Sequence, residues 1–172
     1  MICFGDAYFD NCGECSSGSA SCPEVTDLPD DQGYQVYITF DPSLYDDDPL
    51  RLPEGYTIER LDGDTWTSLH SFHSYGSESY QTVAATLVNS IEDDDGVITE
   101  ENLTTFRIIA AMNEGNFATP SFTGTSTDNI HPAAPEIDAL SSSLVDNHLT
   151  LSWEGVSDYD LSYYQIYLED DE

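Results

Sequence analysis

The residues most suited to chemistry stand at the start of the sequence, where all four cysteines fall within the first 22 residues. They are Cys3, Cys12, Cys15 and Cys22. Thiolates bind Zn²⁺ tetrahedrally, so Cys12-Gly13-Glu14-Cys15 and the outer pair offer a zinc site as one interpretation. A redox motif is disfavoured, because no βαβ pattern surrounds the CxxC. We favour two disulfides, with the three alternative pairings left open, since clustered cysteines in even number are typical of extracellular modules.

Carboxylates are the second group with chemical potential. Residues 92–99 resemble the middle of an EF-hand loop, but Ile91 and Asn102 stand at the first and twelfth positions, where carboxylate ligands belong. An acidic loop between strands is the main interpretation, and a weak calcium site of another kind is the alternative. The candidate calcium ligands are Asp93, Asp95, Asp128 and Asp158. The same two interpretations apply to Asp27 with Asp30 and Asp31, and to Asp46 with Asp47 and Asp48. No cofactor other than calcium is expected.

Histidine and serine could in principle form a hydrolytic site around His70 and His73. There is no Gly-x-Ser-x-Gly elbow and no strand-to-helix turn to expose a nucleophile. Glycoside hydrolysis needs a pair of carboxylates, but acidic pairs occur throughout the sequence, so their presence does not identify a catalytic site. The sequence therefore predicts a protein that is not an enzyme.

Aromatic residues offer a further candidate, a platform on which sugar rings could stack. The two sets are Tyr37 with Trp66, and Tyr159 with Tyr163. Cross-strand packing is the main interpretation, because β-sandwiches use such residues routinely.

Alternation of apolar and polar residues predicts that short strands carry these groups. Residues 34–40 alternate strictly and would place Tyr34, Val36, Ile38 and Phe40 on one face. Residues 104–112 would do the same with Phe106, Ile108, Ala110 and Met112. Further strands are predicted at 56–61, 65–69, 80–88 and 117–125. With no helical period, the pattern indicates an all-β, antiparallel sandwich over residues 34–127.

The flanking segments divide the chain further. Residues 1–33 are predicted to be a small, separate cysteine-rich lead-in with a connector rich in turn-forming residues. Residues 128–135 form a proline-containing linker. Residues 136–172 are predicted to hold the first strands of a second sandwich, at 136–140, 149–153 and 163–168.

Several of these segments resemble fibronectin type III domains. The resemblance is carried by Leu149-x-Leu151-x-Trp153 and by Tyr163-Tyr164-x-Ile166-Tyr167, with Pro135 before them. Residues 106–116 are similar to the family's tyrosine-x-valine-x-alanine strand and its glycine-asparagine turn. Phe106 stands where the corner tyrosine is usual, so the corner hydrogen bond cannot form. The resemblance implies an immunoglobulin-like β-sandwich and specifies fold better than activity.

The cysteine-rich start, Asp10-Asn11-Cys12-Gly13-x-Cys15 with Gly18 and Cys22, is similar to short inserts between repeats of large secreted proteins of marine bacteria. This resemblance implies a secreted or cell-surface, extracellular location. Since Met1-Ile2-Cys3 does not begin a signal peptide, we expect these residues to come from a longer precursor.

Charge excludes whole classes of partner. The sequence has 34 Asp and Glu against 3 Lys and Arg, a net charge of −31. Three arginines cannot build a basic patch, so nucleic acid is excluded, and an anionic membrane surface is an equally poor partner. No apolar run reaches the ~20 residues of a membrane span, so membrane insertion is not expected either.

The second predicted sandwich supplies the expected partner surface. Its two apolar strand faces are Leu149, Leu151 and Trp153 with Tyr164, Ile166 and Leu168. In a complete sandwich an opposite sheet would cover them. We therefore expect packing against other protein chains or domains, as a homo-oligomer or filament. The predicted function is a structural or adhesive module, and the alternative is a spacer or carbohydrate-binding accessory region of a secreted hydrolase.

Overall fold

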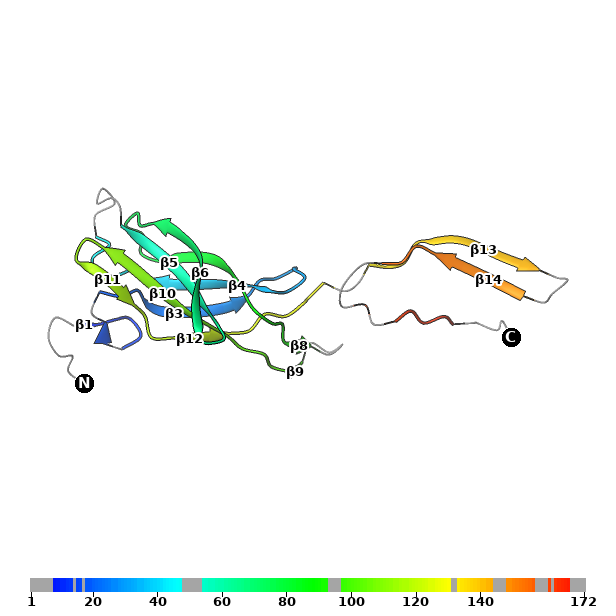
Figure 1. Ribbon diagram of the computed structural model, residues 1–172, viewed down its shortest axis with the longest axis horizontal. Helices are drawn as coiled ribbons and strands as arrows, with labels where there is room; N and C mark the ends of the chain where they lie inside the picture. Colours follow the sequence, from blue (N-terminus) through cyan, green and yellow to red (C-terminus); the bar gives the residue numbers. More distant parts are fainter. Residues whose placement is uncertain are drawn as a thin grey trace. The chain divides into compact units, whose positions relative to one another are not determined.

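The computed structural model describes residues 8–13, 15–16, 18–47, 54–92, 97–130, 133–143, 148–156, 161 and 163–167. The chain divides into two compact units, unit 1 (Met1–Asn129) and unit 2 (Ile130–Glu172). All regular structure in the described residues is β (Figure 1). No helix in this part of the chain is long and apolar enough to cross a membrane.

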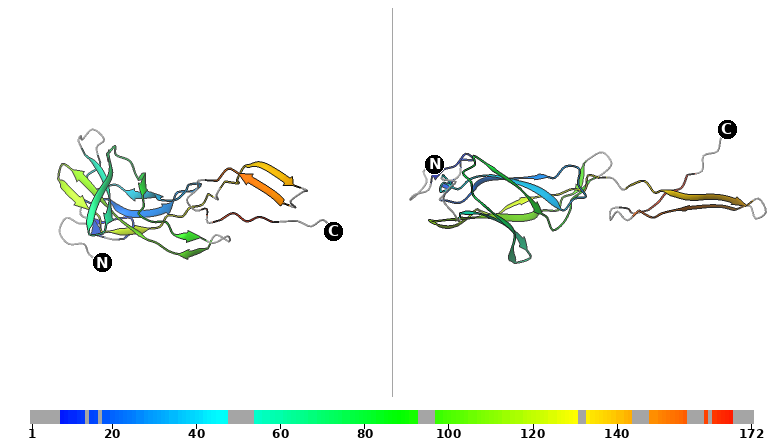
Figure 2. Two further views of the ribbon diagram at one scale, coloured as in Figure 1. Left: turned by 45° about the vertical axis from the view of Figure 1, so that its right-hand side comes forward. Right: turned by 90° about the horizontal axis from the view of Figure 1, so that it is seen from above.

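Unit 1 is a sandwich of two antiparallel sheets. One sheet has the order β3-β4-β7, formed by β3 (Ser21–Asp27), β4 (Gln35–Asp41) and β7 (Tyr80–Ala85). The other has the order β11-β10-β5-β6, with β12 also on β10; its strands are β5 (Gly55–Asp62), β6 (Thr65–His73), β10 (Thr104–Met112), β11 (Gly115–Ala118) and β12 (Phe122–Gly124). Figure 2 shows blue β3 and β4 in one layer and yellow-green β10 in the other.

Two short hairpins complete unit 1. They are β1 (Tyr8–Phe9) with β2 (Cys15–Ser16) in the lead-in, and β8 (Ile91–Glu92) with β9 (Ile98–Glu100) between β7 and β10.

The core lies between the two sheets, where alternate residues point inward. Phe106, Ile108, Ala110 and Met112 are all buried, which confirms the predicted face of residues 104–112. Val36, Ile38 and Phe40 are buried as predicted. The prediction that Tyr34 shares their buried face is wrong, because Tyr34 is 44% exposed. Its φ of 64° turns the chain before β4 begins, so the alternation does not extend to it.

The predicted connector before residue 34 is wrong over its first half. Residues 21–27 are strand β3, and Glu24 to Asp27 pair with Thr39 to Val36 of β4. Pro23 and the acidic residues conceal this strand in the sequence. Proline is tolerated on an edge strand at a bulge, and the β3–β4 register shifts between Ser21 and Glu24. The sandwich therefore begins well before residue 34.

The predicted strand at 117–125 is interrupted. β11 ends at Ala118, β12 begins at Phe122, and both pair with β10. Pro120 lies in the gap and has no N–H to continue the ladder. Thr119 replaces the ladder locally, because its N–H donates to Ile108 O at 2.9 Å and its Oγ1 accepts from Ile108 N at 3.0 Å.

Unit 2 contains the hairpin of β13 (Ile137–Ser143) and β14 (His148–Trp153). The predicted third strand at 163–168 is wrong for residues 163–167, which carry no strand. An extended segment becomes a ladder strand only with a partner alongside it, and none of the described residues of unit 2 pairs with it. Leu168 lies outside the described residues.

Candidate functional site

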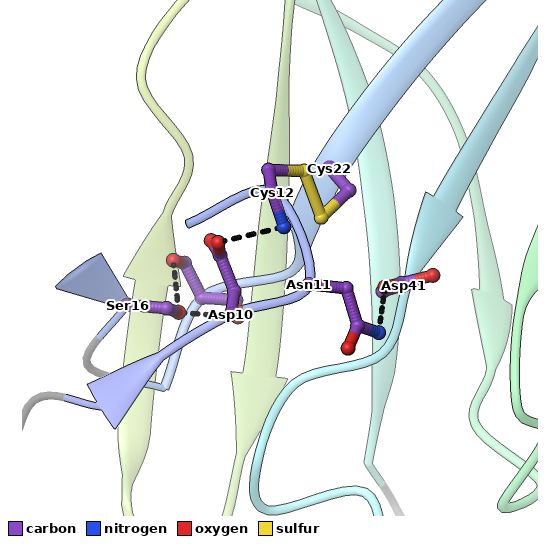
Figure 3. Close-up of a disulfide and its surroundings, with 7 residues drawn as sticks. Asp10, Asn11, Cys12, Ser16, Cys22 and Asp41 are labelled. Atoms are coloured by element: carbon purple, nitrogen blue, oxygen red, sulfur yellow. Dashed lines mark hydrogen bonds between the residues drawn. A yellow bond between two sulfur atoms is a disulfide. The ribbon is translucent and has the colours of Figure 1, made fainter. Parts of the chain in front are cut away.

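The cysteines form disulfides at one end of unit 1. Cys12 is bonded to Cys22 (Figure 3), which selects one of the open pairings. Cys15 is disulfide-bonded as well. Cys3 lies outside the described residues. Asp10 with Cys12 and Cys22 is the one group of potential metal ligands found among the described residues. Bonded sulfurs are not thiolates, so the zinc interpretation is wrong for this pair.

The lead-in is not a separate module, because it is packed onto the sandwich. Ala20 is only 2% exposed and belongs to the core. Gly18 lies so close to the Tyr45 ring that an added Cβ would stand 2.5 Å from it. Ser43 Oγ donates to Gly18 O at 2.5 Å, and Asn11 Nδ2 donates to an Asp41 carboxylate oxygen at 2.6 Å (Figure 3).

A buried carboxylate, Asp46, organises the loops at this same end. Its Oδ2 accepts from Tyr56 Oη at 3.0 Å and from Tyr80 Oη at 2.5 Å. Its Oδ1 accepts from Gly76 N at 3.1 Å. Tyr56 Oη in turn accepts from Ser43 N at 2.9 Å. Asp46 therefore joins loops on either side of the core to strands β5 and β7.

The two tyrosines of this network are held neutral. Burial raises the pKa of Tyr56 far above its ordinary value of 10.0, helped by the neighbouring Asp46 charge. Burial also raises the pKa of Tyr80, and its hydrogen bond to Asp46 acts in the same direction. Both hydroxyls remain donors at neutral pH, so the site holds structure together. Both Asp46 oxygens accept hydrogen bonds, which favours the structural interpretation of this acidic run over calcium.

A second acidic cluster lies where the chain leaves unit 1. Asp27 Oδ1 accepts from Thr127 N at 3.0 Å and Oδ2 from Thr127 Oγ1 at 2.5 Å. Asp31 and Asn129 exchange two backbone-anchored bonds, Asp31 N to Asn129 Oδ1 at 2.9 Å and Asn129 N to Asp31 O at 3.2 Å. Burial raises the pKa of Asp31, and the charges of Asp27 and Asp128 add to this.

Of the four predicted calcium ligands, the structure describes only Asp128, whose charge acts on the neighbouring Asp31. Among the described residues Asp128 belongs to no close group of three ligand-type side chains. Asp93, Asp95 and Asp158 lie outside the described residues. Calcium binding therefore stays a prediction.

The histidines occupy strand β6, where their contacts are structural. His70 Nε2 lies 2.6 Å from Thr82 Oγ1 of β7, so this pair ties the two sheets together. His73 is exposed at the end of β6 opposite Gly55.

The first predicted aromatic platform does not form, because Tyr37 and Trp66 belong to different sheets. Trp66 instead lies under the Arg107 guanidinium, whose Cζ is 4.2 Å from the ring centroid. Arg107 also pairs with Glu59 at 2.6 Å. Tyr159 lies outside the described residues, so carbohydrate binding around Tyr163 stays a prediction.

Unit 2 holds an open, mostly apolar groove of about 470 Å³. Its walls include Pro135, Ile137, Leu151, Trp153, Tyr164 and Ile166. The rings of Trp153 and Tyr164 meet edge to face with centroids 5.3 Å apart, and Val156 N donates to Tyr164 Oη at 2.7 Å. Ile137 is 67% exposed and Ile166 63%, so this surface is uncovered in the described structure.

The groove brings together four of the six residues predicted as the assembly face: Leu151, Trp153, Tyr164 and Ile166. Leu149 belongs to strand β14, and Leu168 lies outside the described residues. The predicted assembly face omitted two residues that line the groove, Pro135 and Ile137. Pro135 directly precedes the first predicted strand of unit 2, and this position could have indicated both.

The sheet order of unit 1 is that of a fibronectin type III-like sandwich: three strands face a sheet of five, in which β11 and β12 pair with successive parts of the same edge of β10. No protein-family model matches the sequence, and no curated protein matches it. Among solved structures, the crystal structure of FN3tt is similar at 10% identity, with a TM-score of 0.40, covering 64% of this chain and 95% of that one.

Two further solved structures are similar at the same level. The twitchin kinase region from C. elegans is 15% identical with a TM-score of 0.42, covering 77% of this chain and 20% of that one. The fibronectin type III domain of human fibronectin type III domain containing protein 3 is 14% identical with a TM-score of 0.36, covering 66% and 91%. The fold assignment rests on the sheet order, which agrees with the fold predicted from the sequence.

Proposed function

We propose that this chain is a non-enzymatic, structural or adhesive module of a secreted or cell-surface protein, and that a neighbouring chain completes unit 2, as in a filament. The observation that carries the proposal is the uncovered groove around Trp153 and Tyr164. Exposing large apolar side chains costs roughly 1.5 to 3 kcal/mol each, so contiguous apolar surfaces of this kind are typical of protein interaction sites.

Unit 1 supports the same proposal, because its reactive side chains hold the fold together. Asp46 accepts bonds from two tyrosines, His70 joins the two sheets, and Arg107 pairs with Glu59. The Cys12–Cys22 disulfide is consistent with an oxidising, extracellular location. The net charge of −31 suits a surface surrounded by cations.

Sedimentation velocity at high and low salt tests assembly. At about 1 M NaCl the Debye length is about 3 Å, so repulsion between copies is screened and association through unit 2 is expected. At about 0.01 M, where it is about 30 Å, the chain should sediment as a monomer.

Ile166→Asp should abolish the association at high salt, because it puts a charge in the groove. Ile98→Asp is the matched control, since Ile98 is exposed in unit 1 and should leave association unchanged. A chain that stays monomeric at every salt concentration contradicts the filament proposal.

A further inference from the structure

The turn between β5 and β6 contains an Asp–Gly pair, Asp62–Gly63. Asp62 is the last residue of β5 and pairs with Thr65, so Gly63 and Asp64 form the turn. Gly63 has a φ of 63°, the left-handed conformation that a glycine supplies in a tight hairpin turn. In an Asp–Gly pair the side-chain carboxyl group can react with the following main-chain nitrogen, because glycine has no side chain to hinder the approach.

The main-chain nitrogen of Gly63 is accessible. A Cβ added to Gly63 would meet no atom within 4 Å, so no neighbouring group covers this side of the residue. Its N–H donates a hydrogen bond to none of the residues that the structure describes. The ladder of this hairpin is formed by the flanking strands, so the fold does not need the Gly63 N–H.

Arg60 holds the carboxylate with which this nitrogen would react. Arg60 Nε donates to Asp62 Oδ1 at 2.7 Å and Arg60 Nη2 donates to Asp62 Oδ2 at 3.0 Å, which is a bidentate pair. Arg60 Nη1 also donates to Ala85 O at 3.0 Å and to Thr86 O at 3.2 Å, at the end of β7 in the other sheet. The guanidinium is therefore fixed from two sides, and the Asp62 carboxylate cannot turn without breaking two hydrogen bonds.

Arg60 also keeps this carboxylate ionised. Its hydrogen bonds hold the pKa of Asp62 below the ordinary value of 3.8, and its positive charge acts in the same direction. The facing residues of β6, at 65–67, carry no charge, and Asp64 is the other carboxylate of the turn. Ring closure at Cγ needs the neutral carboxyl group, because its hydroxyl can leave as water, whereas a carboxylate would have to expel an oxide ion.

We propose that Asp62–Gly63 is a site of spontaneous covalent modification, at which a succinimide forms and opens to isoaspartate, and that Arg60 suppresses the reaction in the folded chain. In the first step Gly63 N bonds to Asp62 Cγ, the Cγ–OH bond breaks, and the N–H proton leaves with the hydroxyl as water. In the second step water adds at the former main-chain carbonyl carbon of Asp62, and the bond from that carbon to Gly63 N breaks. One water molecule is released and one is consumed, and nothing is oxidised or reduced.

The modification removes the contact that suppresses it. In isoaspartate the main chain runs through Cβ and Cγ of residue 62, and the carboxylate stands directly on Cα, so Arg60 loses its bidentate partner. The hydrogen bonds from Arg60 to Ala85 O and Thr86 O then lose their support on that side. We therefore expect faster amide exchange at the β5–β6 turn and at the end of β7 in the modified chain. This inference concerns unit 1 and is independent of the proposed assembly through unit 2.

The test follows isoaspartate formation over time in the full, folded chain at neutral pH. Isoaspartate and aspartate peptides have equal mass, so chromatography after digestion separates them and fragmentation spectra assign the modified residue. Arg60→Gln should raise the rate at residue 62 by about tenfold, because it removes a charge-assisted bidentate pair. Arg60→Lys should raise it less, since lysine keeps the charge without the planar fork. Circular dichroism checks that each variant is folded.

Two controls separate this role of Arg60 from a general loosening of the hairpin. Ser68→Ala removes a hydrogen bond to Glu59 between the same two strands and leaves Arg60 in place, so the rate at residue 62 should not change. Asp95–Gly96, the other Asp–Gly pair of the sequence, is an internal reference whose rate Arg60→Gln should leave unchanged.

The pH dependence gives a readout that loosening alone would not produce. The ratio of the Arg60→Gln rate to the wild-type rate should be constant near neutral pH, where both carboxyl groups are ionised. It should fall as the pH is lowered through 3.8, because the carboxyl group of each chain becomes protonated. Equal rates in the two chains, equal acceleration by Ser68→Ala, or a ratio that does not change with pH would overturn the proposal.

Discussion

At the scale of single residues, Asp46 shows how one buried carboxylate can hold several loops. It receives two tyrosine hydroxyls and one backbone N–H, and through Tyr56 and Ser43 it reaches the lead-in at Gly18. Phe106 has no hydroxyl for the corner hydrogen bond that is usual in immunoglobulin-like sandwiches, so the tyrosine anchors of this sandwich lie elsewhere. Nothing in the sequence distinguishes Asp46 from its acidic neighbours, because burial depends on residues far along the chain.

Tyr80→Phe tests this network. The change removes a donor to Asp46 and the acceptor of Tyr75 N, so we expect unit 1 to lose about 1 to 3 kcal/mol of unfolding free energy. Urea unfolding followed by circular dichroism measures it. Tyr75→Phe is the matched control, because Tyr75 is 60% exposed, and it should stay within about 0.5 kcal/mol of wild type. Equal effects of the two changes would contradict the role of the Tyr80 hydroxyl.

High pH should weaken unit 1 for the same reason. Burial raises the pKa values of Tyr56 and Tyr80 above 10.0, so above that pH the unfolded chain releases protons that the folded chain retains. The stability due to these groups is fully present below pH 10.0 and falls as the pH rises above it. Urea midpoints across this range should fall less steeply in Tyr80→Phe than in wild type. Parallel curves would contradict the prediction.

At the scale of elements, the sequence is informative where one face of a strand is buried and misleading at edges. β4 and β10 are central, so their alternation is clear and their buried faces follow from it. β3 is an edge strand with a proline and acidic residues, and the same composition also suits a connector. Residues 163–167 have a strand-like pattern, but the ladder they need depends on neighbours that a local pattern does not contain.

The lead-in is an element whose attachment is measurable. Exhaustive alkylation without reductant should label no cysteine, since Cys12 and Cys22 are bonded across a separation of 10 residues. The double change Cys12→Ser with Cys22→Ser should lower the unfolding free energy by about 3 kcal/mol, through the freedom it gives the unfolded chain. The sandwich should remain folded, because most of the core lies in β4, β5 and β10.

Asn11→Ala is the control for the lead-in. It removes the hydrogen bond to Asp41 and keeps the cross-link, so a change within about 0.5 kcal/mol is expected. Labelled thiols in the untreated protein, or a loss from Asn11→Ala as large as that from the double change, would contradict the importance of the disulfide.

At the scale of the whole molecule, charge is the dominant constraint. The value of −31 is visible in the sequence, and it excludes classes of partner without any structure. Which carboxylates are paired is visible only in the fold: Asp27 accepts from Thr127, Glu59 holds Arg107, and Asp62 lies 2.7 Å from Arg60. With 34 acidic residues against 3 basic ones, the carboxylates of the chain repel one another on average, and cations screen this repulsion.

Calcium should therefore raise the melting temperature more than sodium at equal ionic strength, because an ion that binds only the folded chain stabilises it. Scanning calorimetry measures the difference. Asn substitutions at Asp93, Asp95, Asp128 and Asp158 should reduce the calcium-specific gain. Asp64→Asn, in the exposed turn before β6, is the control and should leave it unchanged. Equal effects of the two cations would indicate screening alone.

The bonds between Asp27, Asp31, Thr127 and Asn129 have a mechanical consequence. A force applied to the chain on the C-terminal side of Asn129 acts on the Asn129–Asp31 and Thr127–Asp27 hydrogen bonds before it acts on β12. Ser126, between β12 and Thr127, accepts hydrogen bonds from Ser90 N at its backbone oxygen and from Gln35 N at its Oγ. Tension on this end is thus shared with Asp31, in the segment between β3 and β4, and with Asp27 and Gln35, the adjoining ends of those two strands, before it reaches β12.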